Sequence, residues 1–337
     1  MKNDLSCAVV RDLLPSYIDG LTAPETNAAV EAHLRTCPDC ARLHRQMVAP
    51  ETPPEREADR EVDYLKQVRR KSRLRVALAV LVTAALLMGG LAAKVFLIGS
   101  PADTGAMAWE VTETDTGIRV QVISAASANA YWGWKLTQEG DLLTITCREG
   151  LVSPVHPTAS GDIDVTLSPG VTEVRLGDKV VWQEGTIIDR RVLAAWNART
   201  PYVGDMPALN KLAGALDICG LCGDYTNALH TSQRPYGWTL EFLDYGWNQK
   251  DAVVRDREME RLSVLLLALV DNLDEVSWTW KDQSRTVTLA EADAALPELY
   301  DAVNAANGTG WTAPGSVKDC AESPAALQRL WTVVGAR

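Results

Sequence analysis

The sequence predicts a multi-domain chain with a small all-α head, one transmembrane helix, and a region that is first β-rich and then α+β. Helix-type apolar spacing in the head, one long apolar run, and short alternating runs after it predict this class. The predicted domains are the head (1–48), a linker with a basic juxtamembrane segment (49–75), the transmembrane helix (76–98), a β domain (107–188), and an α+β domain with a C-terminal helical tail (189–337).

The three helices expected in the head follow from their start and stop signals. The first covers residues 4–18 and ends before Gly20. Thr22, with a glutamate three residues later, predicts a capping box for a second helix that runs to about Arg35. A third short helix begins near Pro38, since proline suits the first turn of a helix.

The chemistry of the head lies in the spacing His33-x3-Cys37-x2-Cys40. Zinc takes four nitrogen or sulfur ligands in a tetrahedron, and a CxxC turn can place two sulfurs on one ion. Cys7 and His44 are the two candidates for a fourth ligand. So small a core needs additional stabilisation by a metal ion or a cross-link. A thiol-rich segment in a reducing compartment favours Zn2+ over disulfides.

The run DLLPSYIDGLTAPETNAAVEAHLRTCPDC resembles the zinc-finger domain of bacterial anti-sigma factors. The resemblance covers residues 5–45. It implies a three-helix zinc fold in which Cys7, His33, Cys37 and Cys40 are the metal ligands. It also implies that the head wraps a sigma factor of the extracytoplasmic-function type and blocks its access to polymerase.

A linker is expected between the head and the membrane. Residues 49–63 are rich in Pro and Glu, which predicts a solvated linker, and residues 60–71 could form a short amphipathic helix. Apolar residues of the first helix are expected either to contact the sigma factor or to form the small core: Leu13, Leu14, Tyr17 and Ile18.

Residues 76–98 predict a membrane span. A helix of this length rises about 35 Å, which exceeds the roughly 30 Å of a hydrocarbon core. Lys94 is its one charged residue and can snorkel to the interface. Residues 66–75 contain six basic residues, which predicts a cytoplasmic N-terminus, an extracytoplasmic C-terminus, and contact with anionic membrane lipid. Nucleic-acid contact is the competing interpretation of this basic run.

The charge balance excludes nucleic-acid binding by the part beyond the membrane. Residues 1–75 contain 13 Lys and Arg against 12 Asp and Glu, whereas the remainder contains 20 against 32. An acidic surface repels a polyanion, so no direct nucleic-acid partner is expected there. All eleven Trp lie at Trp109 or later, so the larger aromatic core belongs to the outer region.

The outer region changes character near residue 189. Alternating runs separated by turn residues over 109–188 predict an antiparallel sheet in a small sandwich or meander. Beyond it, a helix from about Pro207 to Leu216, a strand within 232–245, a buried helix over 258–273 and a strand over 275–282 are expected. The runs TPYVGD, RPYGWTLEF and LLALVDNLDEVSW resemble a domain of unknown function from Gram-positive membrane regulators, at about residues 199–280.

Four cysteines lie beyond the membrane segment. Cys219 and Cys222 form a CxxC in a Gly-rich stretch that predicts a loop, holding either a local disulfide or two free thiols. A redox pair of the thioredoxin type is less favoured, because no βαβ pattern surrounds it. Cys147 and Cys320 could bridge, but the sequence leaves the connectivity open.

The sequence predicts a regulator and not an enzyme, because no set of residues fits a catalytic motif. The leading hypothesis is a membrane-bound anti-sigma factor whose outer domain responds to an envelope signal, with a regulatory protease as a further partner. The alternative is an envelope ligand-binding or partner-binding protein with a zinc-stabilised cytoplasmic anchor and no sigma factor. A thiol oxidoreductase using Cys219 and Cys222 is a third hypothesis.

Overall fold

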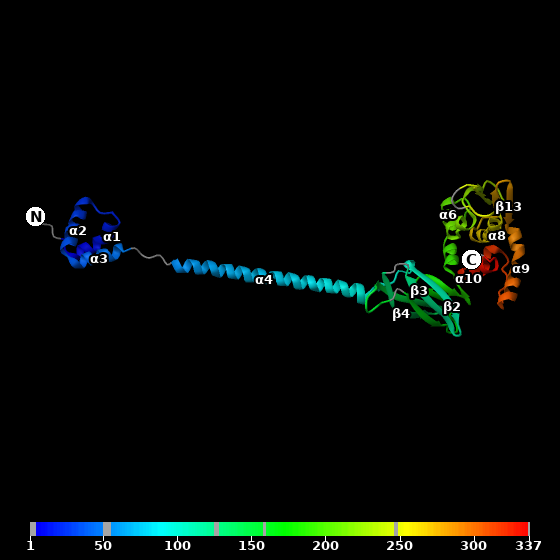
Figure 1. Ribbon diagram of the computed structural model, residues 1–337, viewed down its shortest axis with the longest axis horizontal. Coiled ribbons are helices and arrows are strands. Elements are labelled where there is room, and N and C mark those ends of the chain that lie inside the picture. The colour runs from blue at the N-terminus through cyan, green and yellow to red at the C-terminus, as the bar shows by residue number, and fades with distance from the viewer. Residues whose placement is uncertain (1–4, 50–54, 125–127, 158–159, 246–248, 336–337) are drawn as a thin grey trace. The chain divides into compact units, whose positions relative to one another are not determined.

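The computed structural model (Figure 1) describes residues 5–49, 55–124, 128–157, 160–245 and 249–335. The chain divides into two compact units, Met1–Ala85 and Leu86–Arg337, which are described separately. The fold class predicted from the sequence is confirmed, with a helical head, one long apolar helix, and a β then α+β region.

Three helices form the head, and prolines define where two of them begin. They are α1 (Cys7–Ile18), α2 (Pro24–Thr36) and α3 (Pro38–Val48). Pro24 and Pro38 occupy first-turn positions, where the missing N–H costs nothing. The predicted capping box at Thr22 is wrong, because Pro24 fixes the start of α2 and leaves Ala23 as the N-cap residue.

The core of the head is very small. Its buried hydrophobic residues are Val10, Leu14, Val30 and Cys40. The sequence predicts that Leu14 either contacts a partner or forms the core. It is fully buried, so it belongs to the core and the partner-contact role is wrong. Leu13, Tyr17 and Ile18 are only partly buried. A core of this size cannot by itself offset the entropy of ordering some forty residues.

Residues 55–98 form one continuous helical segment. It consists of α4 (Glu55–Ala93) followed by a π-helical turn, η1 (Lys94–Ile98). The expected solvated linker is wrong for residues 55–63, because they already belong to α4; residues 50–54 lie outside the described residues. Helix propensity of the Glu, Arg and Ala residues there outweighs the general polarity that predicted a linker.

Within the described residues, one helix is long and apolar enough to cross a membrane, Gln67–Ile98. Its apolar side chains do not pack on other parts of the structure: Leu78 is 62% exposed, and Leu86 and Leu87 are each 70% exposed. An uncovered apolar surface of this extent makes the helix a candidate membrane span.

The β region is a sandwich of two sheets. Of the two predicted arrangements, sandwich and meander, the sandwich is the one observed. One sheet has the order β2-β3-β6 and the other β1-β5-β7-β8-β9, with β4 also paired to β5. The strands are β1 (Ser100–Pro101), β2 (Met107–Thr114), β3 (Gly117–Ser124), β4 (Asn129–Glu139), β5 (Leu142–Leu151), β6 (Ser160–Thr166), β7 (Glu173–Leu176), β8 (Lys179–Gln183) and β9 (Thr186–Ile187).

The core of the sandwich forms between its two sheets. Ile118 and Val120 on β3 alternate with exposed residues and meet Ile145 on β5. The sandwich also begins earlier than expected. β1 pairs with β5 through Ser100↔Glu149 and Pro101↔Arg148, so residues just after the apolar helix already belong to a sheet.

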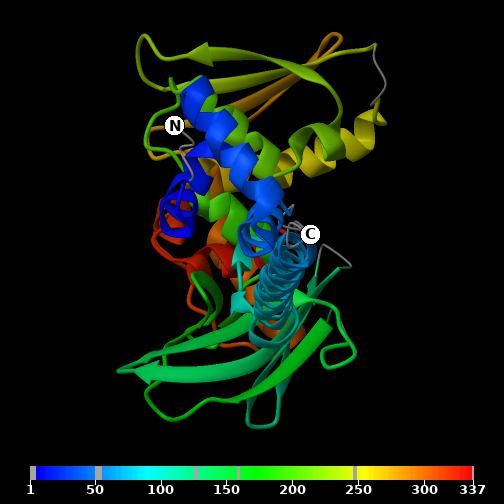
Figure 2. The same ribbon diagram turned by 90° about the vertical axis from the view of Figure 1, so that its left-hand side faces the viewer.

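The α+β region is built on a four-stranded sheet of order β10-β11-β12-β13. β11 and β12 are parallel and the outer pairs are antiparallel. The parallel pair requires a crossover, which α8 supplies while covering one face of the sheet (Figure 2). The strands are β10 (Tyr225–His230), β11 (Gly237–Phe242), β12 (Glu275–Trp280) and β13 (Gln283–Thr288).

Helices supply the rest of the α+β core. They are α5 (Arg190–Asn197), α6 (Met206–Ala215), α7 (Ile218–Cys222), α8 (Ala252–Leu269), α9 (Leu289–Asn307), the 3₁₀ turn η3 (Val317–Ala321) and α10 (Pro324–Val333). The expected helix over 258–273 begins six residues earlier, where the side chain of Asp251 caps its N-terminus. α10 packs back on the sandwich, where Arg329 Nη2 donates to the Glu184 carbonyl at 2.8 Å.

Candidate metal centre

Four potential metal ligands of the head come from three helices and the turn between two of them. Cys7 is the first residue of α1, and His33 lies in the last turn of α2. Cys37 separates α2 from α3 in an extended conformation, since a residue before proline disfavours helix. Cys40 lies in the first turn of α3. The helix boundaries therefore bring all four side chains to one place.

The geometry of this cluster matches a tetrahedral zinc site. The ligand atoms of Cys7, His33, Cys37 and Cys40 all lie within 4.8 Å of one another. Cys7 Sγ is 3.5 Å from His33 Nε2 and 3.7 Å from Cys37 Sγ. A zinc tetrahedron with bonds of about 2.3 Å to sulfur and 2.0 Å to nitrogen has edges of about 3.8 and 3.5 Å. The two distances from Cys7 match these edges, and the donor set is consistent with Zn2+.

The same distances argue against a disulfide in the head. A disulfide needs two sulfurs about 2.05 Å apart, far closer than the 3.7 Å between Cys7 and Cys37. All three cysteines of the head are free. The cluster is thus arranged for metal and not for a cross-link.

Local hydrogen bonds favour the thiolate at Cys37. The backbone N–H of Cys40, with smaller help from Cys7 and Asp39, lowers the pKa of Cys37 to about 7. The hydrogen bond with Cys37 raises the pKa of Cys7, so the first thiolate to form is that of Cys37. A zinc-binding cysteine must be deprotonated, and the start of α3 therefore prepares one ligand for the metal.

The structure separates the two candidates for the fourth ligand. His44 is not among the residues whose ligand atoms gather in the cluster, and its ring lies 5.8 Å from that of Tyr17. Cys7 is in the cluster. His44 on α3 instead lies beside Tyr17, ten residues beyond Cys7 on α1, which the spacing of the sequence could not reveal.

The cysteines of the second unit, Leu86–Arg337, form no metal cluster among the described residues. Cys219 and Cys222 lie on the short helix α7, so the expected loop is wrong, and they form no disulfide. Cys219 Sγ donates to Asp224 Oδ1 at 2.9 Å and is exposed, whereas Cys222 is buried. Cys147 and Cys320 are buried in different cores and are not bridged.

Exposure and pKa predict which thiols react. Burial raises the pKa of Cys147, Cys222 and Cys320 to about 12, so these thiols are shielded and protonated near neutral pH. With a maleimide reagent at pH 7.5, the folded outer unit is expected to take one label, on Cys219, and four after denaturation. Mass spectrometry of the labelled peptides measures this, with Cys219→Ser as the unlabelled control. Labelling of Cys222 in the folded protein would contradict the structure.

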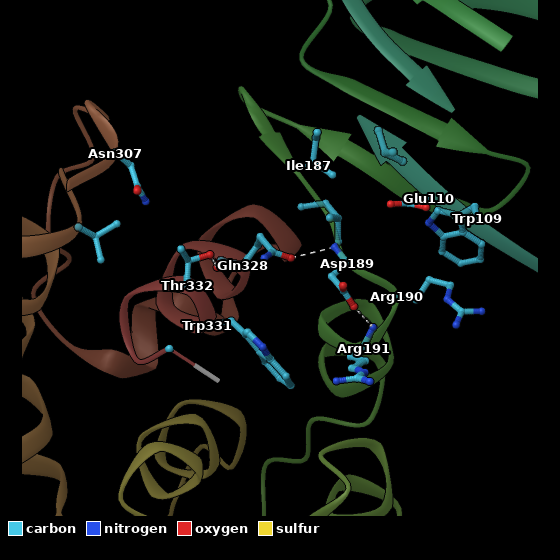
Figure 3. Close-up of a pocket in the computed structure, with 14 residues that line it drawn as sticks. Trp109, Glu110, Ile187, Asp189, Arg190, Arg191, Asn307, Gln328, Trp331 and Thr332 are labelled. Carbon is cyan, nitrogen blue, oxygen red and sulfur yellow. Dashed lines mark hydrogen bonds between the residues drawn. The ribbon is translucent and has the colours of Figure 1, made fainter. Parts of the chain in front are cut away.

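A second feature of the outer unit, a cavity of about 1000 Å³, was not predicted from the sequence. Trp109 on β2 and Trp331 on α10 both line it, as do Asp189 and Arg190 at the start of α5 (Figure 3). The indole Nε1 of Trp109 is buried without a hydrogen-bond partner, and the Arg190 guanidinium lies 6.0 Å from the Trp109 ring. Its residues come from distant parts of the chain, so no local motif indicates it.

Comparison with known proteins supports the assignment of two segments. Residues 7–41 match the family described as "Putative zinc-finger", and residues 196–292 match a domain of unknown function, DUF4825. These matches confirm both resemblances drawn from the sequence.

A curated relative carries the same head. The anti-sigma-YlaC factor YlaD of Bacillus subtilis (strain 168) is 39% identical over 46 residues, which are 14% of this chain and 47% of that protein. The chain thus spans about half the length of the curated relative it matches. No solved structure matches the chain.

Proposed function

We propose that this protein is a membrane-bound anti-sigma factor whose head binds one Zn2+ through Cys7, His33, Cys37 and Cys40. The observation that carries the proposal is the tetrahedral spacing of these four ligand atoms within a segment that matches a zinc-finger family and an anti-sigma relative. Bound zinc supplies folding energy that the small core lacks. The role of the metal is therefore structural, and the head is the part that binds the sigma factor.

The partner is proposed to be a sigma factor of the extracytoplasmic-function type. The surface of the head offers apolar side chains for such a contact, since Val9 is 43%, Leu21 78% and Val48 52% exposed. Single exposed apolar residues are ordinary on protein surfaces, but an all-helical head presents them for packing into a partner groove.

The proposed topology has the head in the cytoplasm and the outer unit beyond the membrane. Lys and Arg concentrate before the apolar segment, and basic residues remain on the cytoplasmic side during insertion. Sensing of an envelope condition is assigned to the outer unit, and the cavity lined by Trp109 and Trp331 supports this role.

The decisive test is co-purification. The full chain in detergent micelles should retain a sigma factor when each sigma factor of the host is offered in turn. Cys219→Ser, a variant far from the head in sequence, should bind equally well. If no host sigma factor is retained by a zinc-loaded protein, the proposal is wrong.

The cavity also favours a second candidate function, an envelope ligand-binding protein with a zinc-stabilised anchor. Under that hypothesis, deletion of residues 1–48 leaves transcription unchanged. Under the anti-sigma proposal, the same deletion raises expression of the genes controlled by the sigma factor. Transcript measurement in the deletion strain separates the two.

A further inference from the structure

Hydrogen bonds fix the end of the membrane helix to the sandwich. Arg148 Nη1 donates to the Ile98 carbonyl at 2.9 Å, and Ser153 Oγ donates to the Phe96 carbonyl at 3.4 Å. The first bond comes from β5 and the second from the loop that follows it. Because Phe96 and Ile98 end the apolar segment, this loop lies level with the outer end of the membrane helix.

The loop after β5 is apolar and exposed. Leu151 is 39%, Val152 37% and Val155 61% exposed. Residues 150–157 read GLVSPVHP and contain no Lys, Arg, Asp or Glu. The Ser153 N–H donates to the His156 carbonyl at 3.0 Å, which closes the loop into a turn and holds Val155 at its tip. We name residues 151–155 the apolar loop.

The apolar loop continues the surface of the membrane helix. Phe96, Leu97 and Ile98 are 38%, 52% and 51% exposed, and Ser153 joins the loop directly to the first of them. Phe96 lies about 3 Å below Ile98 along a helix axis. The headgroup region adds about 5–8 Å to each side of the hydrocarbon core. Side chains at this level therefore reach the boundary between headgroups and acyl chains.

An aromatic pair supports the loop from behind. The Trp132 and His156 rings stack with centroids 3.9 Å apart and planes 6° from parallel. Tryptophan is enriched at membrane–water interfaces, where its ring is apolar and its N–H polar. The loop is thus backed by a rigid group suited to the same depth.

We propose that the apolar loop inserts into the outer-leaflet interface, so that the sandwich rests on the lipid surface beside its own membrane helix. The partner is phospholipid at the headgroup–acyl boundary. Lipid is favoured over a protein partner because the loop carries no charge and is held next to the end of the membrane helix, where lipid surrounds it. This inference depends on the membrane span of the proposed function.

The test is photolabelling of the full chain in nanodiscs that contain a phospholipid with a diazirine on its acyl chain. Mass spectrometry should find adducts on residues 76–98 and also on the apolar loop. The matched control is Leu136 on β4, also a leucine and 42% exposed, which should stay unlabelled. Its partner Ile145 lies six residues along β5 from Leu151, about 20 Å away.

Two variants sharpen the result. Val155→Asp is expected to reduce labelling of the loop several-fold, and Leu136→Asp is expected to leave it unchanged. Adducts on the span without adducts on the loop would overturn the inference while leaving the proposed function intact. Absence of label from both segments would instead reject the membrane span.

Discussion

His33→Ala is expected to abolish zinc binding and unfold the head, whereas His44→Ala is expected to do neither. His33 Nε2 lies 3.5 Å from Cys7 Sγ within the ligand cluster, and His44 lies outside it. Structural zinc contributes apparent folding free energy of about 10–16 kcal/mol in zinc-finger peptides. Four buried hydrophobic residues cannot replace it. Zinc content by mass spectrometry and protection of the head from protease, both on the full chain, provide the measurement.

The two histidines form a matched pair because both lie on helices of the head, but only His33 belongs to the ligand cluster. Full zinc content in both variants would show that the cluster of Cys7, His33, Cys37 and Cys40 is not the metal site. Loss of zinc in both variants would reinstate His44 as the fourth ligand in place of Cys7. Sigma-factor binding should follow zinc content in both variants.

Gly99→Ala is expected to destabilise the unit Leu86–Arg337 by about 2–6 kcal/mol. Gly99 has a φ of +70°, and an added Cβ would lie 2.5 Å from the Glu149 carbonyl oxygen and 2.6 Å from Trp132 Cζ2. A left-handed backbone costs a non-glycine residue about 1–3 kcal/mol, and overpacking adds about 1–3 kcal/mol more. Thermal unfolding of the full chain in nanodiscs, followed by tryptophan fluorescence, measures the effect.

Gly140→Ala separates the two causes. Gly140 has a φ of +64°, close to that of Gly99, but no atom lies within 4 Å of its added Cβ. Its cost should be that of the backbone alone, so Gly99→Ala should be the more harmful of the two. Equal effects would mean that the Gly99 contact with Trp132 is not present in the protein.

Regular periodicity made most elements predictable from the sequence. The apolar run 76–98, the alternating strands and the His-x3-Cys-x2-Cys spacing each report a local physical requirement. Cys7 was reached only as one of two candidates, because its distance from Cys37 depends on how α1 packs on α2 and α3. Helix packing is a tertiary property that spacing along the chain does not contain.

The errors have physical causes of the same kind. The linker at 55–63 looked solvated because composition does not reveal that a helix can be extended from an adjoining stable one. Leu14 looked available to a partner until α1 turned it into the core. The cavity beside Trp109 gathers residues from β2, α5 and α10, which only the folded chain brings together.

The close junction at Gly99 has a consequence for proteolysis next to the apolar helix. Proteases bind several consecutive residues in an extended, unpaired form, and the stretch from Lys94 to Pro101 offers only Gly99 outside η1 and β1. Ser100 and Pro101 are already paired to β5. Proteolysis between Lys94 and Pro101 therefore requires β1 to separate from β5 first, so the pairing of these two strands controls access to this junction.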